Sequence, residues 1–270
     1  MLFGYLDDRS TLPWGELKKG LLDLVVAMGA AFAIYMAQGA VLWLPFVKQA
    51  VVVPPALYIP GAAALLWFTM NATNCSDGVD GLAGSLTLLS LFALAGLLYG
   101  VVGYRPISDY LLIPHNPDGA RWAIFVATMA GSLAGYLWHN AEPSRVLMGD
   151  AGSRLLGMLV GVAVLVAGNP FLIVVVSPVV LVNGGTGLFK LILLRVFRRI
   201  GFDVRPTHTL SPEAASRQHV LIKMLHSIRF PLHDHCRKNM QWSNAQVLMR
   251  FVLIQSFLTP LLFVVLVKIR

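Results

Sequence analysis

Charged residues are scarce in this sequence. Only 13% of its 270 residues are Asp, Glu, Lys or Arg, and 57% are hydrophobic. Soluble domains carry about 25% charged residues, so this composition excludes a chain that stays dissolved as a monomer. Because runs of about 20 apolar residues match the thickness of a bilayer core, we predict an integral membrane protein.

Cysteine and acidic residues are also few. Cys75 and Cys236 lie in no CxxC pair, which excludes the common zinc and redox motifs. Thirteen acidic residues face 21 Lys and Arg, a formal net charge of +8. No basic stripe lies on a soluble domain, so we expect no nucleic-acid partner. In a membrane protein the excess of basic residues indicates cytoplasmic loops.

Long apolar segments account for most of the chain. We predict an all-α, polytopic membrane protein with about seven transmembrane helices, in a single transmembrane domain over residues 1–270. A large cytoplasmic loop covers 197–246. The predicted spans are 20–40, 59–75, 84–103, 121–139, 154–168, 170–196 and 247–268.

The basic residues predict the orientation of these spans. If the segments near Asp7, Asp77, Asp150 and 197–246 share one side, that side holds sixteen of the 21 Lys and Arg. The positive-inside rule places it in the cytoplasm. No span has an acid at its centre and no internal repeat is visible, which disfavours a transporter or channel.

Two acidic motifs lie at the predicted cytoplasmic helix ends. Asp7 and Asp8 are adjacent, and neighbouring carboxylates repel each other unless a cation or a proton relieves them. The alternative is a solvated helix end. Asp150 lies just before a predicted span, either as a helix cap or beside backbone N–H groups that attract phosphate.

A third motif links two spans. Asn71, Asn74, Asp77 and Asp80 fall within ten residues, interrupted by glycines that permit sharp turns. Asn71 and Asn74 share a helix face. Four such polar groups between apolar helices indicate a polar ligand, although Asn, Asp and Gly also cap helices.

A basic motif lies in the large loop. His233 and His235 are followed by Arg237 and Lys238, a group that can bind phosphate or simply form a solvated loop. No further ligands at a zinc spacing are present. Because Mg²⁺ usually takes one or two carboxylates plus substrate phosphates, the four motifs together indicate metal-assisted phosphoryl transfer.

In their order along nearly the whole chain, the four motifs resemble those of the polyprenyl-phosphate N-acetylhexosamine-1-phosphate transferases. The strongest likeness is to the branch that acts as phospho-N-acetylmuramoyl-pentapeptide transferase in bacterial cell-wall synthesis. The resemblance implies Mg²⁺-dependent transfer from UDP-MurNAc-pentapeptide to undecaprenyl phosphate, giving lipid I and UMP. It also implies a bacterial plasma-membrane enzyme with a cytoplasmic active site, and a homodimer as a further partner.

The resemblance implies a role for each motif residue. It implies a Mg²⁺ ion on Asp150, beside Asp7 and Asp8, one of which deprotonates the lipid phosphate. The implied catalytic residues are Asp7, Asp8, Asp150, His233 and His235. The implied substrate-binding residues are Asn71, Asn74, Asp77, Asp80, Lys18 and Lys19.

The sequence departs from the family pattern at three places. Further helices precede the aspartate pair in the family, so either this chain is a fragment, its start is misassigned, or part of the lipid groove is absent. A run of three His is His-Asp-His here, and Leu147 replaces an often aromatic residue. The alternatives are a UDP-GlcNAc or related donor, and an inactive membrane protein or transporter.

Overall fold

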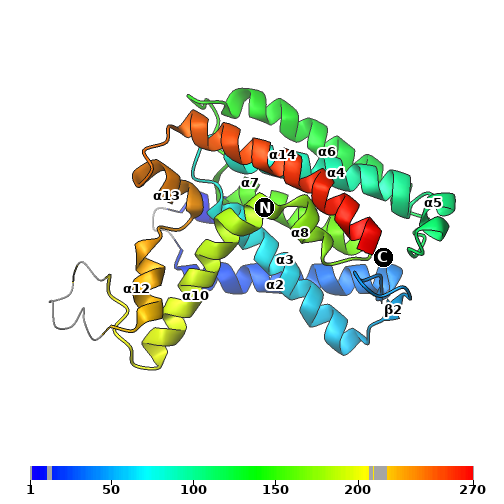
Figure 1. Cartoon of the computed structure of the whole chain (residues 1–270), viewed down its shortest axis with the longest axis horizontal. Helices are drawn as coiled ribbons and strands as arrows, with labels where there is room; N and C mark the ends of the chain where they lie inside the picture. Colours follow the sequence, from blue (N-terminus) through cyan, green and yellow to red (C-terminus); the bar gives the residue numbers. More distant parts are fainter. Residues whose placement is uncertain (1, 11–13, 207–208, 210–217, 270) are drawn as a thin grey trace.

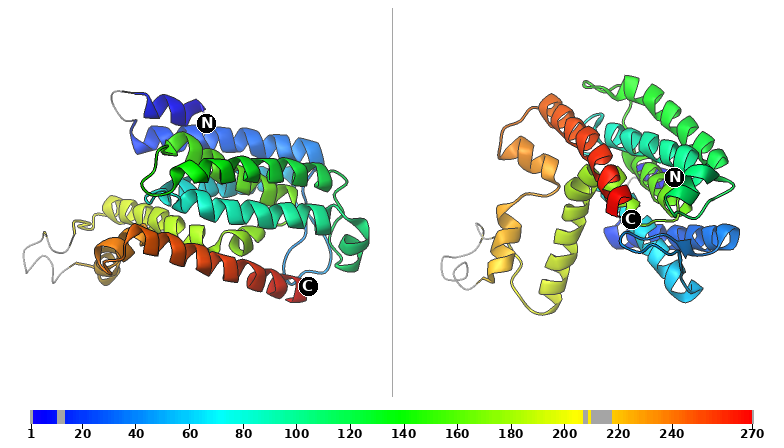
Figure 2. Two further views of the ribbon diagram at one scale, coloured as in Figure 1. Left: turned by 90° about the horizontal axis from the view of Figure 1, so that it is seen from above. Right: turned by 45° about the vertical axis from the view of Figure 1, so that its right-hand side comes forward.

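The protein is a bundle of long helices lying side by side (Figures 1 and 2). The computed structural model describes residues 2–10, 14–206, 209 and 218–269, and the backbone alone at 2, 3, 8, 16 and 267–269. The long helices are α2 (Glu16–Gln38), α3 (Pro55–Cys75), α4 (Leu82–Leu97), α6 (Gly119–Asn140), α7 (Gly149–Val166), α10 (Thr186–Arg199) and α14 (Asn244–Ile269).

Short elements connect them. They are α1 (Leu2–Asp8), β1 (Val41–Leu42), β2 (Val51–Val52), the π-helices η1 (Leu98–Val102) and η2 (Leu181–Gly185), α5 (Arg105–Tyr110), α8 (Leu172–Val176), α9 (Pro178–Val180), α12 (Val220–Ser227) and α13 (Leu232–Lys238).

The polytopic helical fold predicted from the sequence is confirmed. Among the described residues, five helical segments are long and apolar enough to cross a membrane. They are Leu17–Gln38, Leu82–Val102, Gly149–Val166, Pro178–Arg199 and Asn244–Leu266. The other two predicted spans correspond to α3 and α6, helices of 21 and 22 residues that complete the bundle.

One local prediction was wrong. The span expected at 170–196 is broken into α8, α9, η2 and α10, because Pro178 disfavours helical backbone at Ser177, which has φ −132° and ψ 42°. The connection between α2 and α3 contains a short antiparallel hairpin, in which Val41 pairs with Val52. Valine favours such extended backbone.

Helix α3 lies at the centre of the packing, against α2, α7 and η2. A Cβ on Gly157 of α7 would lie 2.4 Å from the carbonyl oxygen of Thr69, so only glycine permits this close approach of α7 to α3. The contact brings the start of α7 next to the end of α3, where the second and third polar motifs lie.

The bundle has two different ends (Figure 2, left view). At one end lie the hairpin and α5, and the carbonyl oxygens that end α7 accept hydrogen bonds. Trp43 Nε1 donates to Ala167 over 2.7 Å, and Gln38 Nε2 donates to Leu165 over 3.2 Å. At the other end lie α1, α13 and all four predicted motifs, so one end of the molecule carries the candidate chemistry.

Candidate active site

Asp150 lies in the first turn of α7, where Gly149 supplies a left-handed backbone conformation, φ 63°. Its two carboxylate oxygens have different partners. Asn74 Nδ2, at the end of α3, donates to Oδ1 over 2.8 Å and to Ser153 Oγ over 3.0 Å. Lys19 Nζ binds Oδ2 over 2.9 Å. Residues from two other helices, α2 and α3, thus hold this carboxylate.

Asp7, at the end of α1, joins the same cluster. It is 7% exposed, accepts a hydrogen bond from the backbone N–H of Trp14 over 2.8 Å and forms an ion pair with Lys19. Lys19 therefore bridges Asp7 and Asp150, which places both carboxylates around one cation. The side chain of Asp8 lies outside the described residues.

A buried ion pair adjoins the cluster of Asp7, Lys19 and Asp150. Asp23 of α2 is 4% exposed and Arg154 of α7 is 8% exposed, and the two form an ion pair. Arg154 Nη2 also lies 3.3 Å from Asp150 Oδ2. Asn71 Nδ2 donates to Asp23 over 3.3 Å. Asn71, predicted to bind substrate, thus faces this pair.

The loop between α3 and α4 carries Asp77 and Asp80. Burial, followed by the negative charges of Asp150 and Asp80, raises the pKa of Asp77 to about 6. Asp80 accepts a hydrogen bond from the backbone N–H of Ser144 over 3.3 Å. Asp77 therefore lies within the electrostatic reach of Asp150, and Asp80 ties its loop to the segment that precedes α7.

Helix α13 packs on the same loop. A Cβ on Gly78 would lie 2.1 Å from His233 Nε2, and Arg237 Nη1 donates to the Gly78 carbonyl over 3.4 Å. His233 is 3% exposed, and its Nδ1 lies 3.1 Å from Asn183 Oδ1. Burial, with the nearby cations Arg237 and Lys238, lowers the pKa of His233 despite the opposing charge of Asp234.

The remaining predicted residues are placed as follows. His235 is half-buried, and its Nδ1 accepts a hydrogen bond from the backbone N–H of Arg229 over 3.4 Å. The Lys18 ammonium lies over the Trp14 ring, 3.6 Å from its centroid. Of the two neighbouring lysines, Lys19 is the one that joins the acidic cluster.

Comparison with known proteins decides the family. Residues 1–168 match the family model described as Glycosyl transferase family 4. The chain belongs to this family. It is also similar along its whole length to the phospho-N-acetylmuramoyl-pentapeptide-transferase of Treponema pallidum strain Nichols, with 45% identity covering 69% of that protein.

Proteins of the same name from other organisms are also similar. That of Brachyspira hyodysenteriae is 31% identical over 98% of this chain and 61% of its own length. That of Gemmatimonas aurantiaca is 30% identical over 94% of this chain and 67% of its own length. As a glycosyl transferase family 4 member, this chain is a multi-pass membrane enzyme that transfers sugar phosphates.

The family uses Mg²⁺, and the donor atoms of the cluster fit that ion. Asp7 and Asp150 present hard oxygen ligands, and the shared contact with Lys19 shows that the two carboxylates can flank one cation. No three His, Cys, Asp or Glu side chains group as a complete metal site among the described residues. Mg²⁺ does not require three, since substrate phosphates and waters supply its other ligands.

Sequence reasoning missed Asp23, Arg154 and Ser153. The first two carried a signal, because both fall within predicted apolar spans. Charged side chains within membrane helices are rare and usually pair with one another, so each of these two residues is expected to have a partner. Ser153 carried no signal beyond its place in the first turn of a helix.

Proposed function

We propose that this glycosyl transferase family 4 member transfers phospho-N-acetylmuramoyl-pentapeptide from UDP-MurNAc-pentapeptide to undecaprenyl phosphate. The products are lipid I and UMP. The enzyme acts at the cytoplasmic face of a bacterial plasma membrane and depends on Mg²⁺. The names of the relatives support the donor and the acceptor.

One observation carries the chemistry. Asp7 and Asp150 are far apart in the sequence, yet both bind the same ammonium group, Lys19 Nζ, at one end of the bundle. Two carboxylates held around a single cation form a site where a diphosphate can be bound and its charge neutralised. The basic residues of that end outnumber its acids, which supports a cytoplasmic location.

The reaction needs no separate protein nucleophile, because a phosphate monoester is already anionic. An oxygen of the lipid phosphate forms a bond to the β-phosphorus of the UDP-sugar. The bond from that phosphorus to the bridging oxygen breaks, and UMP leaves with the electron pair. Total charge is unchanged, since one diphosphate and one monophosphate become another such pair.

The chain's own residues bind and orient these groups. Asp150, with Asp7 and Asp8 beside it, would hold Mg²⁺, which neutralises phosphate charge when bound. Asp7 or Asp8 would accept a proton from a protonated lipid phosphate. Asn74, Asp77 and Asp80 would line the nucleotide pocket.

Lys19 and the basic residues of α13 would supply positive charge to this pocket. Lys19 can turn from the carboxylates to a phosphate oxygen once a divalent ion is present. His235 and Arg237 would bind the diphosphate or the sugar, and buried His233 would hold α13 against the loop at Gly78.

UMP release by the purified protein in detergent tests the proposal. With undecaprenyl phosphate and UDP-MurNAc-pentapeptide, we expect UMP and lipid I in equal amounts. EDTA should stop the reaction, and Mg²⁺ should restore it. Turnover that ignores EDTA would contradict the metal role, and turnover with UDP-GlcNAc alone would replace the proposed donor.

A further inference from the structure

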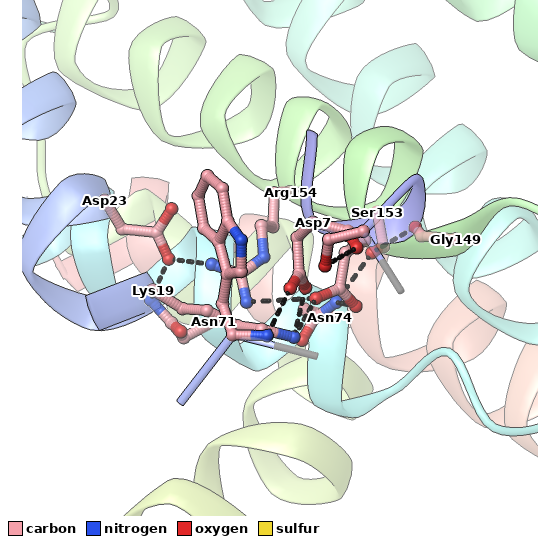
Figure 3. Close-up of polar contacts among 11 residues, drawn as sticks. Asp7, Lys19, Asp23, Asn71, Asn74, Gly149, Ser153 and Arg154 are labelled. Carbon is pink, nitrogen blue, oxygen red and sulfur yellow. Dashed lines mark hydrogen bonds and ion pairs between the residues drawn. The ribbon is translucent and has the colours of Figure 1, made fainter. Parts of the chain in front are cut away.

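The buried pair Asp23–Arg154 touches the proposed metal ligand. Arg154 is one turn after Asp150 on α7, and its two terminal nitrogens point to different acids. Nη1 binds Asp23 Oδ2 (Figure 3). Nη2 lies 3.3 Å from Asp150 Oδ2. The planar fork of arginine suits such two-sided binding, which a lysine cannot reproduce.

Asp23 is itself held in place. Asn71 Nδ2 donates to Asp23 Oδ2 over 3.3 Å and to the carbonyl oxygen of Trp67 over 2.9 Å. Asp23 of α2 is therefore held by α3 as well as by Arg154 of α7. The fixed carboxylate of Asp23 therefore holds Nη1 of Arg154 in place. With Nη1 held, Nη2 of the same guanidinium orients Asp150 Oδ2.

Asp23 also affects the net charge of the cluster around Asp150. The described side chains include three acids, Asp7, Asp23 and Asp150, and two bases, Lys19 and Arg154. One negative charge is left over. Without Asp23, two acids would face two bases, and the cluster would lose its net attraction for a divalent cation.

We propose that Asp23 and Arg154 are positioning residues for Asp150, which orient its carboxylate and keep the cluster anionic for divalent-cation binding. This inference rests on the proposed role of Asp150 as a metal ligand. The competing explanation is that the pair only joins α2 to α7.

A paired variant separates the two explanations. Removing one partner of a buried ion pair leaves an uncompensated charge, whereas replacing both by apolar residues is often tolerated. We therefore expect Asp23→Leu/Arg154→Leu to remain folded, as judged by size-exclusion chromatography in detergent. If the pair only joins the helices, this variant recovers full function.

The measured quantities are Mn²⁺ binding without substrate, by electron paramagnetic resonance, and the steady-state constants for UMP release. For the paired variant we expect Mn²⁺ affinity and kcat to fall about 10- to 100-fold, the usual loss when a residue supporting a metal ligand is removed. KM for UDP-MurNAc-pentapeptide should stay unchanged. Asp23→Asn, which makes the cluster neutral, should weaken Mn²⁺ binding further.

If the paired variant fails to fold, Arg154→Lys provides the test. This variant keeps the positive charge but lacks the planar guanidinium that binds two acids, so we expect it to lower Mn²⁺ affinity as well. Asp118→Asn is the matched control, since its exposed ion pair with Arg121 lies far along the chain, at the start of α6, and should have no effect. Wild-type Mn²⁺ binding and kcat in the paired or Arg154→Lys variants would overturn the inference. Mn²⁺ binding that survives Asp150→Asn would instead overturn the metal-ligand role of the proposed function.

Discussion

At the scale of single residues, the site depends on how Asp150 is surrounded. Its Oδ1 accepts from the neutral amide of Asn74, and its Oδ2 faces the cations Lys19 and Arg154. Charged hydrogen bonds are roughly twice as strong as neutral ones. The carboxylate is therefore oriented before any substrate binds, which is what a preorganised site requires.

Replacing this carboxylate by its amide should remove activity without unfolding the protein. For Asp150→Asn we expect UMP release to fall by at least about 100-fold, the scale seen when one preorganised electrostatic contact is lost. The measurement is UMP release in detergent. Asp109→Asn, in the ion pair with Arg105, is the matched control and should retain activity. Normal turnover by Asp150→Asn would remove Asp150 from the mechanism.

The buried carboxyl group of Asp77, proposed to line the nucleotide pocket, should lower the stability of the folded protein when it is ionised. Its pKa is raised to about 6, so the folded protein keeps a proton that an unfolded chain releases near 3.8. The resulting stabilisation is complete below pH 3.8 and is lost as the pH rises through about 6. At pH 7.5 the ionised Asp77 therefore destabilises the ligand-free protein.

Asp77→Asn should remove this penalty. We expect the variant to be more stable than wild type at pH 7.5 by about 1–3 kcal/mol, because a change of one in pKa is worth about 1.4 kcal/mol. The gain should shrink towards pH 4.5, and turnover should fall. Thermal unfolding of the variant and of wild type in detergent, at pH 7.5 and at pH 4.5, measures the difference in stability. Equal melting temperatures of the two proteins at pH 7.5 would contradict the prediction.

At the scale of elements, α13 is held to the loop between α3 and α4 by very close packing. The His233 ring occupies the space beside Gly78, and Asn183 from the broken helix accepts from both its backbone N–H and its ring. Asn183 lies in the π-helix η2, so this irregular turn of the helical segment Pro178–Arg199 holds α13 in place.

Gly78→Ala should displace α13. The added methyl group would overlap the His233 ring, and such overpacking typically costs about 1–3 kcal/mol. We expect a lower melting temperature and reduced UMP release. Gly135→Ala in α6 is the control, since a Cβ there meets nothing within 4 Å. Equal behaviour of the two variants would show that the contact between His233 and Gly78 has no role.

At the scale of the whole molecule, the two ends of the bundle should face opposite sides of the membrane. Gln49 lies between the hairpin strands and Ser243 just before α14, and both are exposed. In a Cys75→Ala/Cys236→Ala background, Gln49→Cys should react with an impermeant maleimide in intact spheroplasts. Ser243→Cys should react only after the membrane is disrupted. The reverse pattern would place the candidate site outside.

The membrane-spanning helical fold, and the helix ends at which the polar motifs lie, could be predicted from the amino-acid sequence alone. These properties are local, because a run of apolar residues spans the bilayer wherever its neighbours are, and basic loops orient the chain. The motifs also indicated phosphoryl transfer, since their residue types suit Mg²⁺ and phosphate whatever the packing.

Which side chains contact each other in the site could not be predicted from the sequence and follows from the packing of the helices. Lys18 and Lys19 are adjacent in sequence, and the packing of α2 against α7 selects Lys19, 131 residues from its partner Asp150. The same packing brings Asp23 to Arg154, and the packing of α2 against α3 brings Asn71 to Asp23. Pro178 breaks a helix that its hydrophobicity predicts to be continuous. Such contacts depend on the relative positions of helices, which local apolar pattern and charge do not specify.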